Sequence, residues 1–176
     1  MSNTALRELY PAELIDERVR ALASRINEDY RGKDLVVVCV LKGAFMFFAD
    51  LVRRLDVEPV MDFVRVASYG KSDTSSGTVS FTKDVELPLE GKDVLIVEDI
   101  VDSGVTMDFL LREIRSRGVK SLRVAALVDK VERREVDLSV DYAGFTIDSG
   151  FIVGYGLDYA ERYRELPGIF VVETDA

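Results

Sequence analysis

The chain has 176 residues, 48% of them hydrophobic, which is enough for one folded domain with a core of its own. Because 32 acidic residues outnumber 23 basic ones, the net charge is −9, and nonspecific binding to nucleic acid is not expected. The chain contains no histidine, which excludes His-based catalytic triads and His-ligated metal sites.

Along the chain, apolar periodicity predicts alternating helices and strands. Helices are predicted over residues 12–30, around 48–55 and from about 104 to 117, the last one ending at Gly118. Strands are predicted over Leu35–Leu41, Val60–Ala67, Val94–Val97 and Leu122–Val128. This alternation predicts an α/β fold in which helices flank a parallel twisted sheet.

Two regions depart from this alternation. Residues 68–78, SYGKSDTSSGT, are rich in Ser and Gly, so they form either a disordered surface loop or a flexible lid. Beyond residue 140 the pieces YAGFTI, FIVGYG and IFVVE read as short strands, which predicts a small appended subdomain. No linker is present, so residues 1–176 are predicted to form a single domain.

The only cysteine and the short apolar runs predict a cytoplasmic protein. Cys39 lies in the run LVVVCVL, where a buried thiol is the expected state, and one cysteine cannot form a disulfide within the chain. The first residues form no continuous apolar signal segment, and no apolar run approaches the ~20 residues that span a bilayer. We therefore expect no membrane partner.

The segment VLIVEDIVDSGVTM (Val94–Met107) carries the clearest chemical signal. Glu98 and Asp99 follow a buried strand directly, at the end of a parallel sheet, where ligands bind. The next helix is predicted to start near Gly104, so its free N–H groups and positive dipole end form a cradle for phosphate. The Gly-Lys-Ser/Thr ending of a Walker A loop is missing.

Adjacent carboxylates would repel a phosphate, so they are expected to face another part of the ligand. Such a pair can accept hydrogen bonds from the vicinal hydroxyls of a ribose and can share a Mg²⁺ ion. A ribose 5-phosphate meets both demands, with its 2′ and 3′ hydroxyls at Glu98 and Asp99. The alternative is a solvated acidic loop in which Asp102 or Ser103 caps the helix.

The same segment resembles the phosphoribosyl-diphosphate signature of type I phosphoribosyltransferases, and the chain is similar, more narrowly, to the hypoxanthine-guanine branch of that family. Further resemblance lies in VLKGAFMFFADL (Val40–Leu51), SYG (68–70), LVDK (Leu127–Lys130) and FIVGYGLDYAERYR (Phe151–Arg164). The resemblance implies Mg²⁺-dependent transfer of the phosphoribosyl group from phosphoribosyl diphosphate to N9 of hypoxanthine or guanine, giving IMP or GMP and diphosphate. It thereby implies an enzyme of purine salvage. The resemblance also implies the type I phosphoribosyltransferase fold with a small C-terminal/N-terminal subdomain, the purine-binding hood, to which about residues 140–176 contribute.

The resemblance also implies roles for the acidic turn. Asp102 matches the family's proposed general base near purine N7. Glu98 and Asp99 would hold the ribose hydroxyls and, together with Asp158, the Mg²⁺ ion. The 5′-phosphate loop is matched by Asp102, Ser103, Gly104, Val105 and Thr106, although some family members carry Lys in place of Val105.

Other residues match the family outside the turn: Lys42, Gly43 and Arg164 at the diphosphate, Ser68 and Tyr69 at the lid, and Lys130, Phe151, Ile152 and Asp158 at the purine. The ammonium of Lys130 would donate to the 6-oxo group, which favours hypoxanthine and guanine over adenine. Without the resemblance, Lys42 is typical of an exposed lysine at a helix start, and Phe151 is equally typical of a core aromatic.

Three functions agree with these residues. The first is purine salvage, the second is the same reaction with a preference for xanthine or guanine, and the third is a regulator of this fold that binds nucleotides and RNA. Asp102 and Lys130 together favour catalysis, and the net charge of −9 disfavours RNA binding. Family members are dimers or tetramers, so we expect a homo-oligomer.

Overall fold

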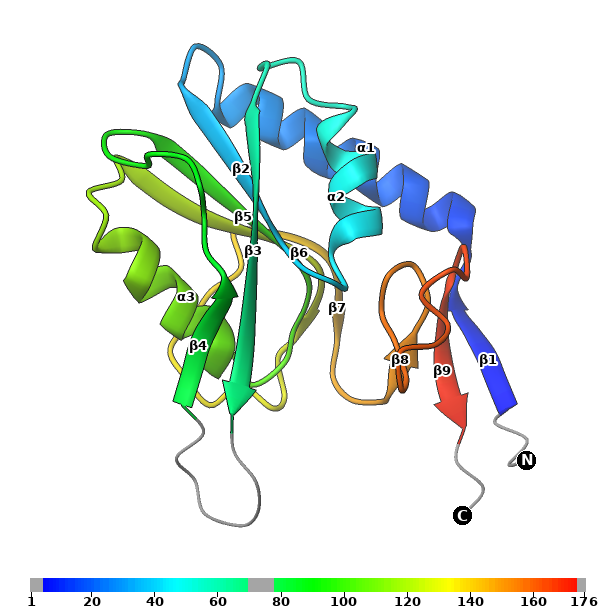
Figure 1. Ribbon diagram of the computed structural model, residues 1–176. Coiled ribbons are helices and arrows are strands. Elements are labelled where there is room, and N and C mark those ends of the chain that lie inside the picture. Colours follow the sequence, from blue (N-terminus) through cyan, green and yellow to red (C-terminus); the bar gives the residue numbers. More distant parts are fainter. Residues whose placement is uncertain (1–4, 70–77, 174–176) are drawn as a thin grey trace.

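The computed structural model of the protein describes residues 5–69 and 78–173 (Figure 1). Its helices are α1 (Ala12–Asp29), α2 (Phe45–Val52) and α3 (Val105–Arg115). The strands of the main sheet are β2 (Leu35–Val40), β3 (Val60–Tyr69), β4 (Thr78–Lys83), β5 (Asp93–Val101), β6 (Ser121–Lys130) and β7 (Tyr142–Ile147). A second, smaller sheet contains β1 (Ala5–Tyr10), β8 (Ile152–Val153) and β9 (Ile169–Glu173).

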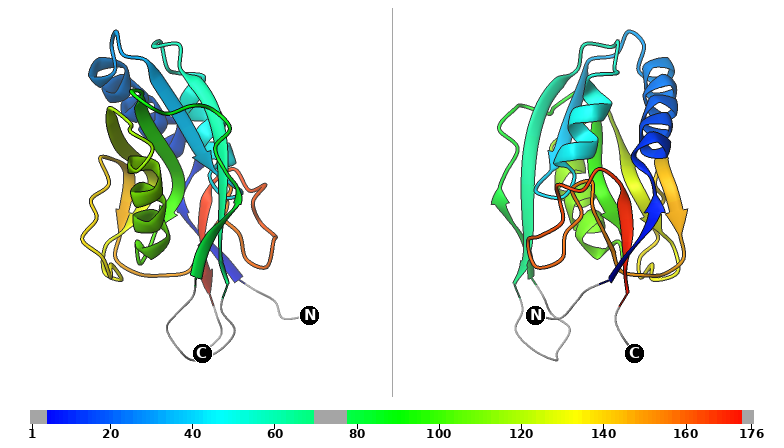
Figure 2. Two further views of the ribbon diagram at one scale, coloured as in Figure 1. Left: turned by 60° about the vertical axis from the view of Figure 1, so that its left-hand side comes forward. Right: turned by 90° about the vertical axis from the view of Figure 1, so that its right-hand side faces the viewer.

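The main sheet confirms the predicted α/β architecture. Its strand order is β4-β3-β2-β5-β6-β7, and every neighbouring pair is parallel except β3 with β4. Helices α1 and α2 lie on one face and α3 lies on the other (Figures 1 and 2). Among the described residues, no helix is long and apolar enough to cross a membrane.

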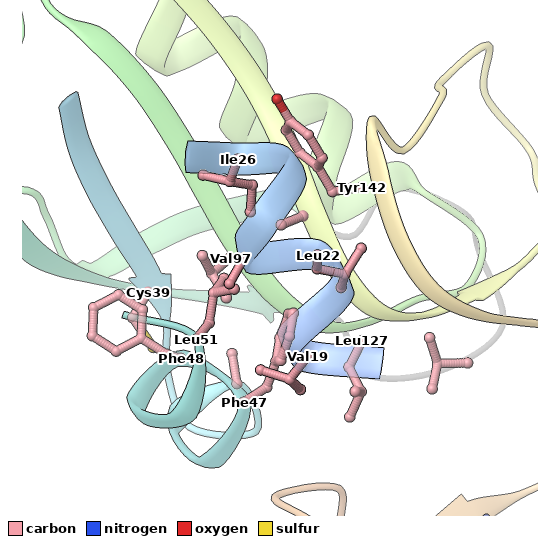
Figure 3. Close-up of a cluster of buried hydrophobic side chains, with 14 of the residues drawn as sticks. Val19, Leu22, Ile26, Cys39, Phe47, Phe48, Leu51, Val97, Leu127 and Tyr142 are labelled. Carbon is pink, nitrogen blue, oxygen red and sulfur yellow. The ribbon is translucent and has the colours of Figure 1, made fainter. Parts of the chain in front are cut away.

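The central strands are buried on both faces because successive side chains point in opposite directions. Val37 and Cys39 pack with α1 and α2, whereas Val36 and Val38 pack with α3. Figure 3 shows part of the first cluster, including Val19, Leu22, Phe47, Leu51 and Val97 around the helices. Cys39 is fully buried, as predicted, and this burial raises the pKa of its thiol to about 12.

Three strands differ from the sequence-based expectation. The piece YAGFTI was predicted to lie in the hood, but as β7 it forms the edge of the main sheet, parallel to β6. Strands β1 and β4 were not predicted. β1 pairs with β9, so the hood contains residues from both ends of the chain, and β8 completes it. The hood therefore begins after β7 rather than near residue 140.

The end residues of the predicted lid, residues 68–78, belong to strands β3 and β4. Ser68 and Tyr69 are the last residues of β3, and they pair with Val79 and Thr78 of β4 in an antiparallel hairpin. Alternation of apolar Val79 and Phe81 with hydroxyl residues was the local signal for β4. The remaining part of the predicted lid, residues 70–77, lies outside the described residues.

A buried carboxylate fastens the segment between β4 and β5 to the sheet. Asp62 on β3 accepts hydrogen bonds from the backbone N–H groups of Phe63 (2.7 Å), Glu86 (2.8 Å) and Leu87 (2.9 Å). Removal from water raises the pKa of this carboxyl, but the three donors and the nearby Lys83 outweigh that effect and lower it overall.

We expect Asp62→Asn to lower the free energy of unfolding by about 1–3 kcal/mol, because the amide nitrogen cannot accept hydrogen bonds. Since the folded pKa of Asp62 lies below the unfolded value, its contribution is present above the unfolded pKa and is lost as the pH falls through the folded pKa. Urea unfolding of the two proteins between about pH 7 and pH 3 measures this difference.

The matched control for this measurement is Asp148→Asn, which removes the same charge from an exposed side chain. We expect its stability to follow that of the unmodified protein at each pH. An equal loss of stability in both variants, or a difference that grows at low pH, would contradict the role of Asp62.

Candidate active site

The carboxyl ends of the parallel strands lie beside the hood (Figure 1), and contacts there join several of the predicted site residues. Lys130 at the end of β6 donates to Asp102 in the loop after β5 and to the carbonyl of Gly150, just before the hood. Gly43 in the loop after β2 lies against Asp99. Segments far apart in the sequence thus meet at the carboxyl ends of β2, β5 and β6.

Glu98 and Asp99 belong to β5 itself, which extends beyond the predicted Val94–Val97. Both side chains are half-buried. Removal from water and the charge of Asp99 raise the pKa of Glu98 well above its ordinary value, and burial also raises the pKa of Asp99. The pair stores unfavourable electrostatic energy when both groups are ionised, and a cation or hydroxyl donors would relieve it.

Two glycines allow three segments of the chain to approach one another beside this carboxylate pair. A Cβ atom on Gly43 would lie 1.7 Å from Oδ2 of Asp99, and one on Gly156 would lie 2.0 Å from the carbonyl oxygen of Gly43. Both distances are far too short for any side chain. The peptide bond between Leu41 and Lys42, at the start of the Gly43 loop, is cis.

The loop after β5 confirms the predicted helix start and forms a small hollow. The N-cap of α3 is Gly104, with φ of +84°, and not Asp102 or Ser103. Because glycine has no side chain, no side-chain hydrogen bond caps this helix. Ser103 Oγ instead accepts a long 3.4 Å hydrogen bond from the N–H of Val105. A cavity of about 150 Å³ lies over this turn, lined by Glu98, Ile100, Val101, Asp102, Ser103, Gly104, Thr106 and Met107. Apart from the N–H of Val105, the N–H groups of the first turn of α3 have no partner within the helix and could bind an anion there.

Lys130 and Asp102 form an ion pair in which the lysine is buried and the aspartate is half-buried. Lys130 is only 6% exposed, and its ammonium donates to Asp102 Oδ2 (3.4 Å) and to the carbonyl of Gly150 (3.1 Å). The exposed Arg133 also donates to Asp102 Oδ2, at 3.4 Å. The other oxygen, Oδ1, is buried without a hydrogen-bond partner among the described residues. Asp102 therefore has one oxygen that faces cations and one that is shielded from solvent and lacks a hydrogen-bond partner.

Arg134 is a positioning residue that the sequence analysis missed. Its guanidinium donates to the carbonyls of Asp102 (3.2 Å) and Leu138 (2.6 Å) and pairs with Asp129. Its Cδ lies 2.9 Å from where a Cβ on Gly104 would be, so it packs directly beneath the turn. Arg134 thereby fixes the carbonyls of Val101 and Asp102 on the side of the loop where its guanidinium lies. The Arg-Arg pair at 133–134 was visible in the sequence, but no local pattern distinguishes the buried member.

The residues predicted for the diphosphate form an ion-pair cluster. Arg164 is largely buried; it donates to the carbonyl of Gly156 (2.7 Å) and pairs with Asp158 Oδ1 (2.8 Å). Lys42 Nζ lies 2.7 Å from Glu161 Oε2, and the same carboxylate reaches Arg164 through Oε1 at 3.3 Å. The structure therefore brings Lys42 and Arg164 together through Glu161, a residue that the sequence analysis did not single out.

The hood presents an exposed aromatic side chain. Phe151 is 51% exposed, so it is not a core aromatic. Its ring makes an edge contact with Tyr159, with 5.4 Å between the ring centroids. Ile152 next to it is buried and pairs with Val171 of β9, so its backbone position is fixed. A flat apolar ligand could therefore stack on Phe151.

The carboxylates do not enclose a metal ion by themselves. Within residues 5–69 and 78–173, no three acidic side chains lie close enough together to form a complete metal site. Asp158, which was predicted to join Glu98 and Asp99, has both oxygens engaged, by Arg164 and by the N–H of Glu161. A metal at Glu98 and Asp99 would therefore take its remaining ligands from a bound molecule or water.

Comparisons with known proteins agree with this geometry. The sequence model of the phosphoribosyl transferase domain family matches residues 6–160. The hypoxanthine-guanine phosphoribosyltransferase of Bacillus subtilis is 42% identical over 98% of this chain and 96% of its own length. A crystal structure of a hypoxanthine phosphoribosyltransferase from Staphylococcus aureus superimposes with a TM-score of 0.91, is 41% identical, and covers 95% of this chain and 91% of that one.

A longer relative contains a similar sequence as one part. The bifunctional protein TilS/HprT of Listeria monocytogenes is 43% identical over 99% of this chain, but the chain spans only 27% of the length of that protein.

We expect Glu98→Gln to stabilise the ligand-free protein by on the order of 1 kcal/mol, because it removes one of two repelling carboxylates. The folded pKa of Glu98 is raised, so ionised Glu98 destabilises the fold increasingly as the pH rises from its unfolded to its folded pKa. The glutamine carbonyl keeps the 3.1 Å hydrogen bond from the N–H of Asp99. Thermal unfolding near neutral pH should therefore show a midpoint a few degrees higher.

A control for Glu98→Gln is Glu90→Gln, which removes an exposed carboxylate before β5. Its midpoint should change little. A lower midpoint for Glu98→Gln, or an equal rise in both variants, would contradict electrostatic strain at the carboxylate pair.

Proposed function

The chain belongs to the phosphoribosyl transferase domain family, and on this premise we propose that it transfers the 5-phosphoribosyl group from phosphoribosyl diphosphate to N9 of hypoxanthine or guanine. The products would be IMP or GMP and diphosphate, in purine salvage. The proposal rests on one observation. Three features lie together at the carboxyl ends of the parallel strands: the Glu98–Asp99 pair, the N-terminus of α3 and the Lys130–Asp102 pair. Each suits one part of a phosphoribosylated purine.

The sugar phosphate is proposed to bind at the loop after β5. The N–H groups of residues 103–106 and the positive end of α3 would hold the 5′-phosphate. Val105 supplies no ammonium, so this subsite depends on backbone donors. The ribose hydroxyls would donate to Glu98 and Asp99. These hydrogen bonds favour the ionised carboxylates and so offset the burial and the repulsion by Asp99 that raise the pKa of Glu98.

The residues fit the Mg²⁺ ion that the family implies. Two carboxylates combined with phosphate and hydroxyl oxygens of a substrate are a usual donor set for Mg²⁺, which agrees with the lack of a third acidic ligand in the described part of the chain. Glu98 and Asp99 would hold the ion, and Asp158 is a further predicted contact. The bound ion would neutralise negative charge on the leaving diphosphate.

The purine is proposed to lie between Phe151 and Lys130. The ammonium of Lys130 would donate to the 6-oxo group, and the backbone of Ile152 and Asp158 would read the edge of the base. The carboxylate of Asp102, which Lys130 positions through Oδ2, would accept the proton at purine N7 as N9 bonds to C1′. The same carboxylate would stabilise positive charge on the base and sugar in the transition state.

The leaving diphosphate is proposed to bind Lys42, Arg164 and the backbone at Gly43. Arg164 is anchored by the carbonyl of Gly156 and by Asp158, so its guanidinium is fixed before the ligand arrives. The lack of a side chain on Gly43 allows close approach beside Asp99. A homo-oligomer also stays a prediction, and light scattering of the purified protein would measure it.

A spectrophotometric assay with phosphoribosyl diphosphate, Mg²⁺ and single bases tests the reaction. We expect nucleotide from hypoxanthine and guanine but not from adenine, because Lys130 would face the 6-amino group of adenine with a donor against a donor. Xanthine is included to rank the 6-oxopurines. Lys130→Ala should weaken the use of both preferred bases. Equal use of adenine and hypoxanthine by the unmodified protein would contradict the role of Lys130.

Asp102→Asn is expected to slow the chemical step by roughly 10²–10⁴-fold, since the amide cannot take the N7 proton. Phosphoribosyl diphosphate binding should change little, because the loop backbone is unaltered. Single-turnover rates and ligand titration separate the two effects, and Asp56→Asn, at an exposed position between α2 and β3, is the control. Unchanged turnover would remove Asp102 from the base role.

The alternative function is a regulator that binds nucleotides and RNA. Tight binding of phosphoribosyl diphosphate without turnover of any base, together with binding of labelled RNA at moderate salt, would favour this alternative over catalysis.

A further inference from the structure

Glu161 lies between two cations that are proposed to bind diphosphate. One of its carboxylate oxygens is 2.7 Å from Lys42 Nζ, and the other is 3.3 Å from Arg164 Nη2. Lys42 comes from the loop after β2 and Arg164 from the hood, so the carboxylate bridges two separate parts of the fold. A small anion with two oxygens therefore already occupies the position where the two cations converge.

The backbone conformation of residues 160–161 and a hydrogen bond to Asp158 determine the position of this carboxylate. Ala160 (φ +51°) and Glu161 (φ +64°) are both in the left-handed region, which is unfavourable for residues other than glycine. The N–H of Glu161 donates to Asp158 Oδ2 at 2.9 Å, and Asp158 Oδ1 pairs with Arg164 at 2.8 Å. The turn and the arginine are thus tied to the same aspartate, which fixes where the Glu161 side chain starts.

The two sides of the cluster differ in how easily they can move. Glu161 is 65% exposed and Lys42 is 47% exposed, so their ion pair is weak and is exchanged readily in water. Arg164 is only 18% exposed and is held by the carbonyl of Gly156. Its Nε is buried and has no hydrogen-bond partner in the described part of the chain. An incoming anion could replace Glu161 at Lys42 and Arg164 while Arg164 stays in place.

We propose that Glu161 is an internal anion that occupies the diphosphate subsite until diphosphate, free or as part of phosphoribosyl diphosphate, displaces it. This inference rests on the proposed function, which assigns Lys42 and Arg164 to diphosphate. Glu161 lowers the affinity of the subsite, since each diphosphate must break its contacts with both cations. The same competition helps the product to leave, because the carboxylate returns to the cations as diphosphate dissociates.

The test is Glu161→Gln, which keeps the size of the side chain but removes its charge. Titration of Mg²⁺-diphosphate by calorimetry should show a dissociation constant roughly three- to tenfold lower in the variant, the range expected for losing one or two exposed ion pairs. In the steady state, KM for phosphoribosyl diphosphate should fall, and product inhibition by diphosphate should become stronger.

Two further variants separate competition from other effects. Glu165→Gln removes an equal charge from the same segment, where Glu165 forms no ion pair among the described residues. It should leave the affinity for diphosphate nearly unchanged. In a Lys42→Met background, the gain from Glu161→Gln should shrink, because one of the two cations that Glu161 occupies has been removed.

The outcomes decide between the inference and the function on which it rests. Unchanged or weaker diphosphate binding by Glu161→Gln overturns the internal-anion role while leaving the proposed function intact. Equal tightening in Glu165→Gln also overturns it, because net charge alone would then account for the effect. If neither the unmodified protein nor Glu161→Gln binds diphosphate or phosphoribosyl diphosphate, the proposed function fails together with the inference.

Discussion

The close approach of two carboxylates at the end of β5 is the constraint on which the rest of the site depends. Glu98 and Asp99 are adjacent and half-buried; removal from water raises the pKa of both, and the charge of Asp99 raises the pKa of Glu98 further. Gly43 must lack a side chain because the Asp99 carboxylate fills the space where its Cβ would lie. Gly156 must lack one because the carbonyl oxygen of Gly43 fills the corresponding space at that residue. The hood therefore packs on the backbone of the β2 loop, and that loop packs on the Asp99 side chain of β5, beside an unfavourable charge pair. Such a pair is compatible with a stable fold when its purpose is to meet hydroxyls or a cation.

The charge distribution explains how a protein of net charge −9 can receive an anionic ligand. Each cation at the sheet edge is paired with its own carboxylate: Lys42 with Glu161, Arg164 with Asp158, and Lys130 with Asp102. These pairs differ in exposure, from the open Lys42–Glu161 contact to the buried Lys130. The exposed contact is the one that a ligand can replace at little expense, whereas the buried ones fix geometry. Local pairing thus decides binding, and the overall charge contributes mainly to solubility.

Local patterns were sufficient for much of this fold. The buried strands β2, β5 and β6 and the helix α1 follow from continuous or periodic apolar residues, and the start of α3 at Gly104 follows from the small-residue turn. Strand β1 could not be recognised because its pairing partner, β9, lies at the other end of the chain, and the local sequence ALRELY has no clear alternation. The piece that forms β7 was recognised as a strand but placed in the wrong sheet, since no local signal states which edge a short strand joins.

The site was predictable to a similar degree, and for related reasons. Glu98, Asp99 and Asp102 stand out because acids rarely follow a buried strand directly, whereas Arg134 and Glu161 resemble any other charged surface residue. Their roles come from tertiary contacts: Arg134 donates to loop carbonyls beneath the turn, and Glu161 reaches across to a different loop. Motif matching finds groups that face the ligand. It does not find groups that support the loop from behind or that occupy the site in the ligand's absence.

In the proposed reaction, the Lys130–Asp102 pair would join recognition of the base to the chemical step. The ammonium of Lys130 donates to Asp102 Oδ2 and to the carbonyl of Gly150, so the position of the carboxylate depends on the same group that is proposed to read the 6-oxo atom. A base that offers a donor at this position would push the ammonium away and loosen the carboxylate that must accept the N7 proton. Discrimination against adenine would then arise in the rate of the chemical step as well as in binding. A site in which one buried lysine orients the base catalyst and tests the substrate needs no separate element for selectivity.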